Sequence, residues 1–183
     1  MVFVDEEGRL QLTEYGREIA SLQSEINEKV TRYMAKLAIN VLRKYQFRNP
    51  ANRSVEYPDD CDVFPFWCIW KAMIELDDRL HHEELNRVLL RVMRMDQLDE
   101  AIQKIREARK QRDYDVRNEE VLDRILGPRV IDDQPGSRME AYFSYAGCGG
   151  LLLSGSRDGY KVLNPKTRSL VEDAVRTMPE FKV

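Results

Sequence analysis

Three consecutive amphipathic segments between Phe64 and Arg112 constrain the fold more than any other feature of the sequence. The first spans roughly Pro65 to Leu76, and proline suits a first helical turn because no helical acceptor exists there for its missing N–H. Its apolar residues recur at intervals of three and four, as on one face of a helix. These residues are Phe66, Ile69, Trp70, Met73 and Ile74. The pattern predicts a helix that packs against a core.

A second helix is predicted after the polar break at Asp77-Asp78-Arg79. Its apolar residues also have helical spacing, which indicates one buried face. They are Leu85, Val88, Leu89 and Val92. Arg87, Arg91 and Arg94 stand at intervals of four and three, so we expect them to share another face of the same helix.

A third helix is predicted from Asp96 to Arg112, with Asp96 as its N-terminal cap. Its buried face consists of Leu98, Ile102 and Ile105. Its last nine residues, Lys104 to Arg112, hold five basic residues and one acidic residue, a local charge of +4 in a chain of net charge −3. Three short helices of which the third is basic are what a helix-turn-helix DNA reader needs, although many plain helical domains also contain them.

The composition limits the classes of protein to consider. The chain of 183 residues is long enough for one domain with a core, and its 43% hydrophobic and 33% charged residues are typical of globular proteins. A net charge of −3 does not favour nucleic-acid binding, so such a role depends on local charge asymmetry. No apolar run approaches the roughly 20 residues that span a bilayer, and the N-terminus lacks a secretory pattern. Three cysteines favour reduced thiols, so we expect a cytoplasmic protein.

Residues 1–48 are predicted to form an N-terminal hairpin followed by a long helix. Val2–Val4 and Arg9–Leu12 read as short strands on either side of a turn that contains Gly8. The helical apolar pattern runs from Ile19 to Leu42, which is long for a packed globular helix. It indicates a strut or a surface for a second copy of the chain or a partner protein. The region resembles the end of a winged-helix unit, the rest of which would precede this chain.

Residues 49–62 are predicted to be a loop that separates residues 1–48 from a domain at residues 63–183. Two prolines, two asparagines and several acidic residues leave no apolar period in this loop. Within the domain, a short helix is predicted at Asn118–Leu126, and Gly127-Pro128 is expected to end it.

The last fifty residues add a β-hairpin to the helices. A helix is predicted at Ser137–Gly147. Leu151–Leu153 and Tyr160–Leu163 then flank a polar turn with Asp158-Gly159, which is a hairpin pattern. A further helix is predicted at Pro165–Arg176. Helices followed by one small hairpin define a winged helix-turn-helix, so the predicted class is mainly α with a small β-hairpin wing.

An internal repeat supports this class. Residues 8–19 align with residues 159–170 at a constant offset of 151. Both segments contain a turn glycine, a strand leucine, a capping threonine or asparagine, an arginine and a final apolar residue. Each would be a wing strand that leads into a helix, and chance similarity is the alternative.

Several short motifs occur in a fixed order between roughly Leu42 and Arg176. They are Gln46-Phe47-Arg48-Asn49-Pro50, Pro65-Phe66, His82-Glu83-Glu84-Leu85, Ile102 with Ile105-Arg106 and Arg109, Gly150-Leu151, and Leu163-Asn164-Pro165. Together they resemble the target-recognition region of type II restriction endonucleases of the AlwI kind. The resemblance implies winged-helix segments that read a DNA site in a restriction or phage-defence system, while a separate nuclease domain cuts.

The sequence departs from those enzymes at their metal site, in which carboxylates hold Mg²⁺ and a lysine assists the attacking water. Pro58-Asp59 is present, but no Glu-x-Lys or Asp-x-Lys on an apolar strand follows it. Asp158-Gly159-Tyr160-Lys161 has the wrong spacing. The resemblance therefore implies DNA recognition without cleavage, and a nuclease fragment is the third interpretation.

Other chemically suggestive residues are assigned structural roles. His81-His82 lack HExxH spacing, and Cys61 and Cys68 lack a CxxC motif, so no metal site is predicted. Trp70 belongs to an apolar stripe and is expected in the core rather than as a platform for bases. The glycine-rich segment Phe143–Gly150 lacks a Walker lysine. No catalytic constellation and no cofactor are predicted.

The predicted DNA-binding residues are the cations of the second and third helices, of the wing and of the helix behind it. They are Arg87, Arg91, Arg94, Lys104, Arg106, Arg109, Lys110, Arg112, Arg157, Lys161, Lys166 and Arg168. We expect the third helix to enter the major groove of double-stranded DNA, the Arg87 row to touch phosphates and the Arg157 turn to act as the wing. The alternatives are a solvated or cation-stabilised helix end and pairing of Arg87 with the glutamates before it. The second candidate function is a protein-interaction or dimerisation module of winged-helix fold.

Overall fold

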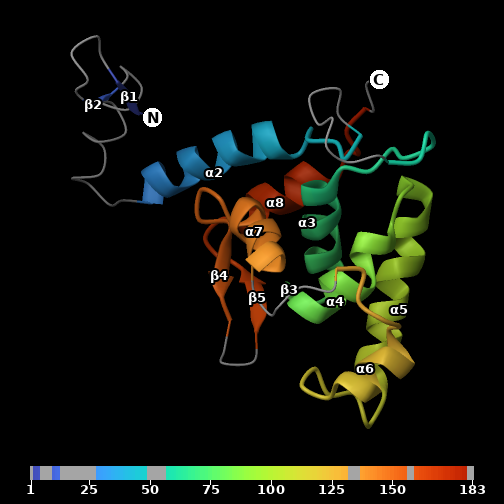
Figure 1. Ribbon diagram of the computed structural model, residues 1–183. Coiled ribbons are helices and arrows are strands. Elements are labelled where there is room, and N and C mark those ends of the chain that lie inside the picture. The colour runs from blue at the N-terminus through green and yellow to red at the C-terminus, as the bar shows by residue number, and fades with distance from the viewer. Residues whose placement is uncertain are drawn as a thin grey trace.

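The structure is a computed structural model in which residues 2–4, 10–12, 28–48, 57–131, 137–155 and 159–180 are described. Within these ranges the chain is mainly helical, with a small three-stranded antiparallel sheet and a separate two-stranded pair (Figure 1). The predicted class, mainly α with a small β-hairpin, is therefore confirmed in its coarse form.

The described residues form seven α-helices and five strands. The helices are α2 (Glu28–Leu42), α3 (Pro65–Glu75), α4 (His82–Arg87), α5 (Leu98–Lys110), α6 (Glu119–Ile125), α7 (Ser137–Ala146) and α8 (Arg168–Val175). The strands are β1 (Val2–Val4), β2 (Leu10–Leu12), β3 (Arg79–His81), β4 (Leu152–Ser154) and β5 (Tyr160–Leu163). Two short 3-10 helices, Leu89–Arg91 and Met95–Gln97, connect α4 to α5.

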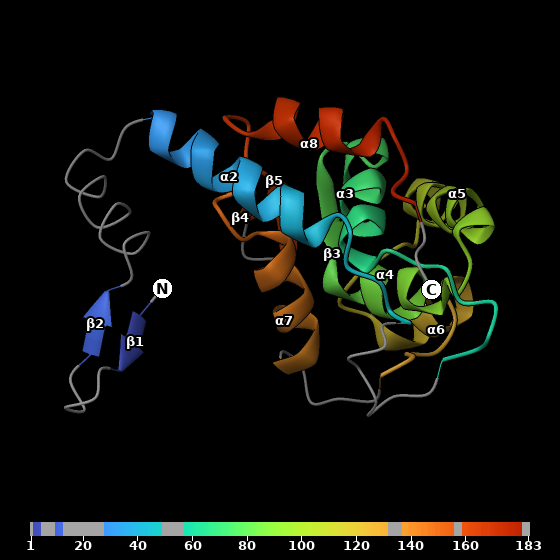
Figure 2. The ribbon, with the colours of Figure 1, turned by 90° about the horizontal axis from the view of Figure 1, so that it is seen from above.

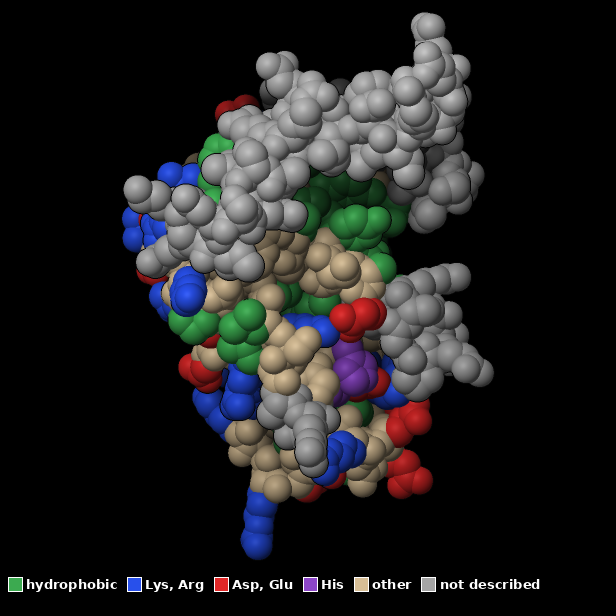
Figure 3. Space-filling view, turned by 90° about the vertical axis from the view of Figure 1, so that its left-hand side faces the viewer, with side chains coloured by type: hydrophobic (Ala, Val, Ile, Leu, Met, Phe, Trp, Pro, Cys, Tyr) green, Lys and Arg blue, Asp and Glu red, His purple; other side chains and the backbone are tan. Residues whose placement is uncertain are grey.

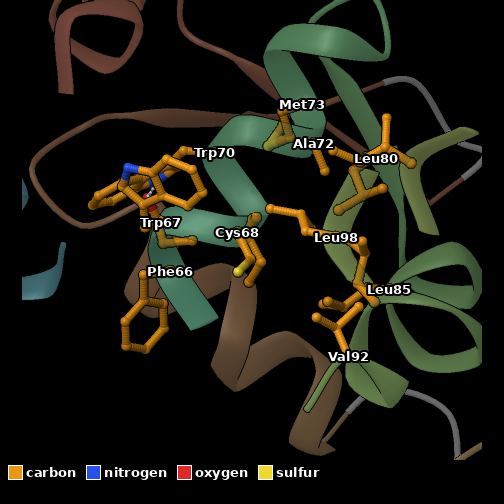
Figure 4. Close-up of a cluster of buried hydrophobic side chains, with 14 of the residues drawn as sticks. Phe66, Trp67, Cys68, Trp70, Ala72, Met73, Leu80, Leu85, Val92 and Leu98 are labelled. Carbon is orange, nitrogen blue, oxygen red and sulfur yellow. Dashed lines mark hydrogen bonds between the residues drawn. The ribbon is translucent and has the colours of Figure 1, made fainter. Parts of the chain in front are cut away.

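α3 lies at the centre of the fold because it is apolar on nearly all sides. Eight of its eleven residues are buried, including Trp70, so the helix is stable only when other elements surround it. In Figure 4 its side chains share one cluster with Leu80 of β3, Leu85 of α4 and Leu98 of α5. The indole N–H of Trp70 donates to the carbonyl oxygen of Ala146 at 2.9 Å, which ties the end of α7 to this centre.

Local signals predicted most of the helices and both hairpins. α3, α5 and α6 occupy the positions expected from the sequence. Asn118 caps α6 by accepting a hydrogen bond from the backbone N–H of Val121 at 3.2 Å, and Gly127 follows the helix with a φ of +92°. α7 and α8 were also predicted, although α8 begins at Arg168 rather than at Pro165. The hairpins β1–β2 and β4–β5 are antiparallel pairs, as predicted.

The second predicted helix is shorter than its apolar pattern indicated. α4 ends at Arg87, and its C-cap, Val88, has a φ of −121° and a ψ of −61°. The chain continues as the 3-10 helix Leu89–Arg91. Val88, Leu89 and Leu90 are nevertheless buried, so an irregular segment fills the core positions that the spacing assigned to a helix.

The cap predicted for the third helix is wrong. Gln97 rather than Asp96 is the residue before α5, and it makes no side-chain cap. The Asp96 carboxylate instead accepts a hydrogen bond from Arg94 at 3.1 Å. An arginine two residues away competes for this carboxylate as a charged donor, and charge-assisted bonds are stronger than those from a backbone N–H.

β3 is a strand that the sequence pattern did not predict. It follows Asp77 and Asp78, whose φ values of 60° and 61° turn the chain after α3. β3 pairs with β5 in a sheet of order β3-β5-β4, and His81 lies opposite Tyr160. The expected polar break is thus followed immediately by the edge strand of the sheet.

α2 packs beside α8, as two views of the ribbon show (Figures 1 and 2). Ala35 and Ile39 on its inner side belong to the same hydrophobic core as α3. The described helix of residues 1–48 therefore shares a core with residues 63–183. The part of the predicted Ile19–Leu42 helix that precedes α2 lies outside the described residues.

A buried carboxylate joins α4 to α5 and β3. The Glu84 side chain is fully buried. One of its oxygens accepts from Arg109 Nε at 2.7 Å and from the Tyr114 hydroxyl at 2.8 Å. The other accepts from Arg109 Nη2 at 2.6 Å and from the backbone N–H of His81 at 2.9 Å. Every acceptor position is thus used, which is what a buried charge requires.

Glu84→Gln is expected to destabilise the protein by about 3–5 kcal/mol, because the amide leaves the guanidinium of Arg109 without its counter-charge in the interior. Urea unfolding followed by circular dichroism measures this loss. Glu75→Gln is the matched control, since Glu75 pairs with Lys71 and Arg106 nearer the surface and its loss should cost about 1 kcal/mol or less. Equal effects of the two substitutions would contradict the role assigned to Glu84.

Candidate nucleic-acid interface

Arg87, which was predicted to touch DNA phosphates, is fully buried. Its guanidinium donates to Glu83 Oε2 at 2.7 Å, to the carbonyl oxygen of Gly127 at 2.8 Å and to the carboxylate of Asp123. A buried charge is costly unless it is paired, and the fold supplies the partners here. The prediction is therefore corrected: Arg87 holds α4 to the end of α6 and does not face solvent.

The predicted row of Arg87, Arg91 and Arg94 does not share a helix face, because α4 ends at Arg87. Arg91 lies in the following 3-10 helix and donates to the carbonyl oxygens of Arg87 at 2.8 Å and of Pro128 at 2.7 Å. Arg94 lies beyond this turn and pairs with Asp96 at 3.1 Å. The three arginines thus belong to three different backbone environments.

The basic end of α5 is partly neutralised by acidic residues of other elements. Arg106 pairs with Glu75 of α3 at 3.3 Å. Arg109 pairs with Glu84 of α4 at 2.6 Å, and burial of this pair leaves its charges facing each other rather than solvent. These two cations hold α5 against α3 and α4, which is a structural role.

The remaining predicted cations, on α5 and elsewhere, differ in whether another group of the fold binds their charge. Lys104 donates to the carbonyl oxygen of Leu126 at 2.8 Å. Lys110, Arg112 and Lys166 are exposed, and none of them pairs with a carboxylate of the described residues. These three keep their charge for an external partner.

The predicted wing contributes little free charge in the described residues. Arg157, which the sequence predicted in the hairpin turn, lies outside them. Lys161 pairs with Glu140 of α7 at 2.8 Å. Arg168, behind the wing, pairs with Asp78 at 2.7 Å.

Six of the twelve predicted DNA-binding residues are thus held by carboxylates. They are Arg87, Arg94, Arg106, Arg109, Lys161 and Arg168. A paired cation must leave its carboxylate before it can bind a phosphate, so its contribution to DNA affinity is reduced. The face formed by the second and third helices is therefore less positive than the sequence indicated.

The structure brings the end of α5, β3 and β5 together around the ring of Tyr160. The guanidinium carbon of Arg79 lies 5.3 Å from the ring centroid, and that of Arg109 lies 5.6 Å from it, within cation–π range. Arg79 is exposed and pairs with no carboxylate of the described chain. Arg79 was not among the predicted DNA-binding residues, because it stands in the polar break between two predicted helices. Its place beside α5 depends on strand pairing.

Gly159, the residue before β5, packs against two histidines. The rings of His81 and His82 are 4.0 Å apart, and His81 Nδ1 accepts a hydrogen bond from the backbone N–H of Glu83 at 3.2 Å. Gly159 has a φ of +80°, and a Cβ atom there would lie 2.8 Å from His81 Nε2 and 3.0 Å from His82 Nδ1. Only glycine fits this position without displacing the turn. No group of three or more His, Cys, Asp or Glu side chains in the described chain is placed to hold a metal ion.

The surface around this turn has no dominant charge. Figure 3 looks onto this side of the molecule, where histidine side chains (purple) reach the surface between acidic (red) and basic (blue) ones. A general attraction to a polyanion is therefore weak on this face, and binding there depends on individual cations such as Arg79.

Cations without a carboxylate partner in the described residues are found together on α2 and the turn that follows it. Arg32, Lys36 and Lys44 are exposed there. From the sequence, this helix was predicted to be a strut or a partner surface only. A count of charges along residues 28–48 was the signal that would have identified its basic character.

Glu83 is a buried carboxylate next to His82. Its carboxylate accepts from Arg87 at 2.7 Å and from Arg129 at 2.7 Å, and it lies 3.3 Å from His82 Nε2. Burial by itself raises the pKa of this carboxyl group, but hydrogen bonds from the three neighbours lower the pKa well below its ordinary value.

Glu83 is expected to make the protein less stable in acid. Because its folded-state pKa lies below the unfolded value of about 4.3, the ionised group contributes stability above that pH, and the contribution is lost as the pH falls below it. Thermal unfolding between about pH 7 and about pH 3 measures the effect. Glu83→Gln should be less stable at neutral pH and should lose less stability on acidification. A loss as steep as that of the unmodified protein would argue against this assignment.

No protein-family model and no curated protein sequence matches this chain. None of the described helices combines the length and the apolar character needed to cross a membrane.

Proposed function

We propose that this chain is a DNA-binding recognition module of the winged helix-turn-helix kind, without nuclease activity of its own. The observation that carries the proposal is the order of its elements, α3, β3, α4, α5, β4 and β5, with the strands arranged β3-β5-β4. In a winged helix the hairpin follows the helix-turn-helix, and its last strand pairs with the strand before the second helix. α6 and α7 are then an insertion between α5 and the hairpin.

In this interpretation α4 and α5 are the helix-turn-helix pair, and the β4–β5 turn is the wing. β5 contacts the end of α5, because the ring of Tyr160 in β5 lies between the guanidinium groups of Arg79 in β3 and Arg109 in α5. An α-helix fits the major groove of DNA, and an adjacent β-ribbon reaches the backbone. The end of α5, β3 and the wing therefore form the proposed DNA-facing edge.

The cations proposed to contact phosphates at this edge are Arg79, Lys110 and Arg112, together with Arg157 on the grounds of sequence. The first three have no carboxylate partner among the described residues. Phosphate contacts position a protein on DNA without reading its sequence. The proposal therefore concerns DNA binding and assigns no target sequence.

A place in a restriction or phage-defence system is part of the proposal. It is supported by the ordered motifs that resemble the target-recognition region of restriction endonucleases of the AlwI kind. The lack of a Glu-x-Lys or Asp-x-Lys sequence after Pro58-Asp59 supports recognition without cleavage. A separate nuclease domain would make the cut in such a system.

The proposal predicts that the chain binds a labelled duplex of random sequence at low salt. Arg79→Gln/Lys110→Gln/Arg112→Gln is expected to weaken binding and to reduce the salt slope of log K by about 2.7, since each neutralised phosphate contributes about 0.9. Fluorescence anisotropy at several salt concentrations measures both quantities.

The matched control removes three exposed cations that already have carboxylate partners, through Arg94→Gln/Arg124→Gln/Arg176→Gln. It changes the net charge by the same amount and is expected to bind DNA as the unmodified chain does. If the unmodified chain binds no duplex at low salt, the proposed function is wrong.

A protein-interaction module is the alternative function, and one surface favours it. The exposed rings of Tyr45 and Tyr145 form a row with the buried ring of Phe66 between them, at centroid distances of 5.5 and 6.0 Å from it. Tyr145 is 60% exposed, and Val41 is 71% exposed. Exposed apolar groups that lie together can mark protein contacts.

Under this alternative, light scattering after size exclusion is expected to give twice the chain mass of 21.5 kDa, because two copies cover this row. Tyr145→Asp should return the mass to one chain, whereas Met178→Asp, at an exposed apolar residue beyond α8, should not. A single-chain mass for the unmodified protein at high concentration would argue against self-association.

A further inference from the structure

The most positive segment of the chain is α2 with the turn after it, and not the end of α5. Residues 28–48 contain six basic residues and one acidic residue, a local charge of +5 in a protein of net charge −3. The basic residues are Lys29, Arg32, Lys36, Arg43, Lys44 and Arg48. A concentration of one sign of charge on one helix is the electrostatic footprint of a polyanion-binding surface.

Four exposed polar residues form one row along α2 and the following turn. Arg32, Lys36, Asn40 and Lys44 recur at intervals of four, so consecutive members are neighbours on the helix surface. The inner side of the helix packs into the core through Ala35 and Ile39. The row therefore lies on the part of α2 that the fold leaves in solvent.

The charges of this row are not compensated. Arg32, Lys36 and Lys44 pair with no carboxylate in the part of the chain that the structure describes, whereas cations of α5 are held by Glu75 and Glu84. A polyanion would meet the α2 cations without first breaking an ion pair. Charge on α2 is thus available to a ligand in a way that most charge on α5 is not.

An aromatic and apolar row lies next to the cations. Tyr33, Val41 and Tyr45 are 43%, 71% and 39% exposed. Tyrosine hydroxyls donate to phosphate oxygens, and tyrosine rings stack on nucleotides. Arg43 and Arg48 at the end of the segment are held by other groups of the fold and are not assigned to this surface.

We propose that the outer face of α2, defined by Arg32, Tyr33, Lys36 and Lys44, is a second binding site, for the phosphate backbone of DNA. Figure 1 shows α2 along the upper side of the molecule, whereas β4 and β5 extend downward from it and α5 ends near α6 at the lower right, so this site is separate from the DNA-facing edge. The inference rests on the proposed function in one respect, that DNA is the ligand. One chain then holds two segments of duplex.

The spacing of the row suits a regular polyanion. An α-helix rises about 1.5 Å per residue, so Arg32 and the last residue of α2, Leu42, are about 15 Å apart along its axis, and Lys44 follows in the turn. One DNA strand carries a phosphate about every 3.4 Å of its axis, so this length of helix lies along about four phosphates. Three cations spread over that length and the turn contact different phosphates rather than compete for one.

A membrane surface and an acidic protein fit this face less well. Amphipathic helices bind membranes by inserting their apolar side. The apolar side of α2, with Ala35 and Ile39, is already buried in the core. A protein interface has an apolar, charge-depleted centre, whereas the exposed row of Arg32, Lys36, Asn40 and Lys44 carries three cations. Exposed cations along one row beside tyrosines favour nucleic acid.

The test uses the full chain with Arg32→Gln/Lys36→Gln/Lys44→Gln, because glutamine preserves the helix propensity of α2. With a duplex of random sequence, the salt slope of log K is expected to fall by about 2.7 and the affinity near 0.1 M salt by roughly tenfold or more. Sedimentation with excess duplex is expected to show two duplexes on each unmodified chain and one on each variant. Circular dichroism checks that the helix content is unchanged.

The edge variant Arg79→Gln/Lys110→Gln/Arg112→Gln, measured in parallel, separates the two sites. Unchanged binding by the α2 variant together with weaker binding by the edge variant overturns the α2 site and leaves the proposed function in place. Weaker binding by the α2 variant alone supports the α2 site and removes the DNA-facing edge. A chain that binds no duplex in unmodified form overturns both.

Poly-glutamate and vesicles that contain anionic lipid are the competitor probes. Displacement of the labelled duplex by unlabelled duplex, but by neither competitor at equal charge concentration, supports DNA as the ligand. If either competitor displaces the duplex equally well, the α2 face binds an acidic protein or a membrane, and its assignment to DNA is wrong.

Discussion

Two adjacent buried glutamates at the start of α4, Glu83 and Glu84, hold the parts of this fold together. Arg87 and Arg129 surround the first carboxylate. Arg109 pairs with the second in a bidentate manner. Removal of one partner would leave the other charge alone in the interior, which costs far more than the loss of a surface pair. The position of α4 between α5, β3 and the segment after α6 is therefore determined by charge pairing as well as by apolar contact.

This pairing decides which cations remain for a ligand. The arginines of α4 and the end of α5 neutralise carboxylates within the fold, so the basic end of α5 carries less free charge than its composition indicates. α2 has one acidic residue, Glu28, and its inner contacts through Ala35 and Ile39 are apolar. Arg32 and Lys36 therefore stay in solvent. A chain of net charge −3 can in this way present a positive surface in one place while it pairs its other cations internally.

Elements whose signals are local could be predicted from the sequence. α6 is an example, because Asn118 caps it and Gly127 ends it within a few residues. β3 could not be predicted, because a strand of three residues is stable only through its pairing with β5, which is far along the chain. The residues of the candidate site were harder to predict from the sequence than β3. Arg87 and Arg91 have the spacing of one helix face, and nothing in that spacing reveals that α4 stops at Arg87.

By itself, the sequence determined the mainly helical class, the hairpins and the charge of each segment, because these properties depend on residues within a few positions of one another. Only the tertiary structure decided that Arg87 and Arg109 serve the interior while Arg32 and Lys36 face solvent. An ion pair depends on which carboxylate the fold brings within about 4 Å of a cation, and that partner can come from any part of the chain.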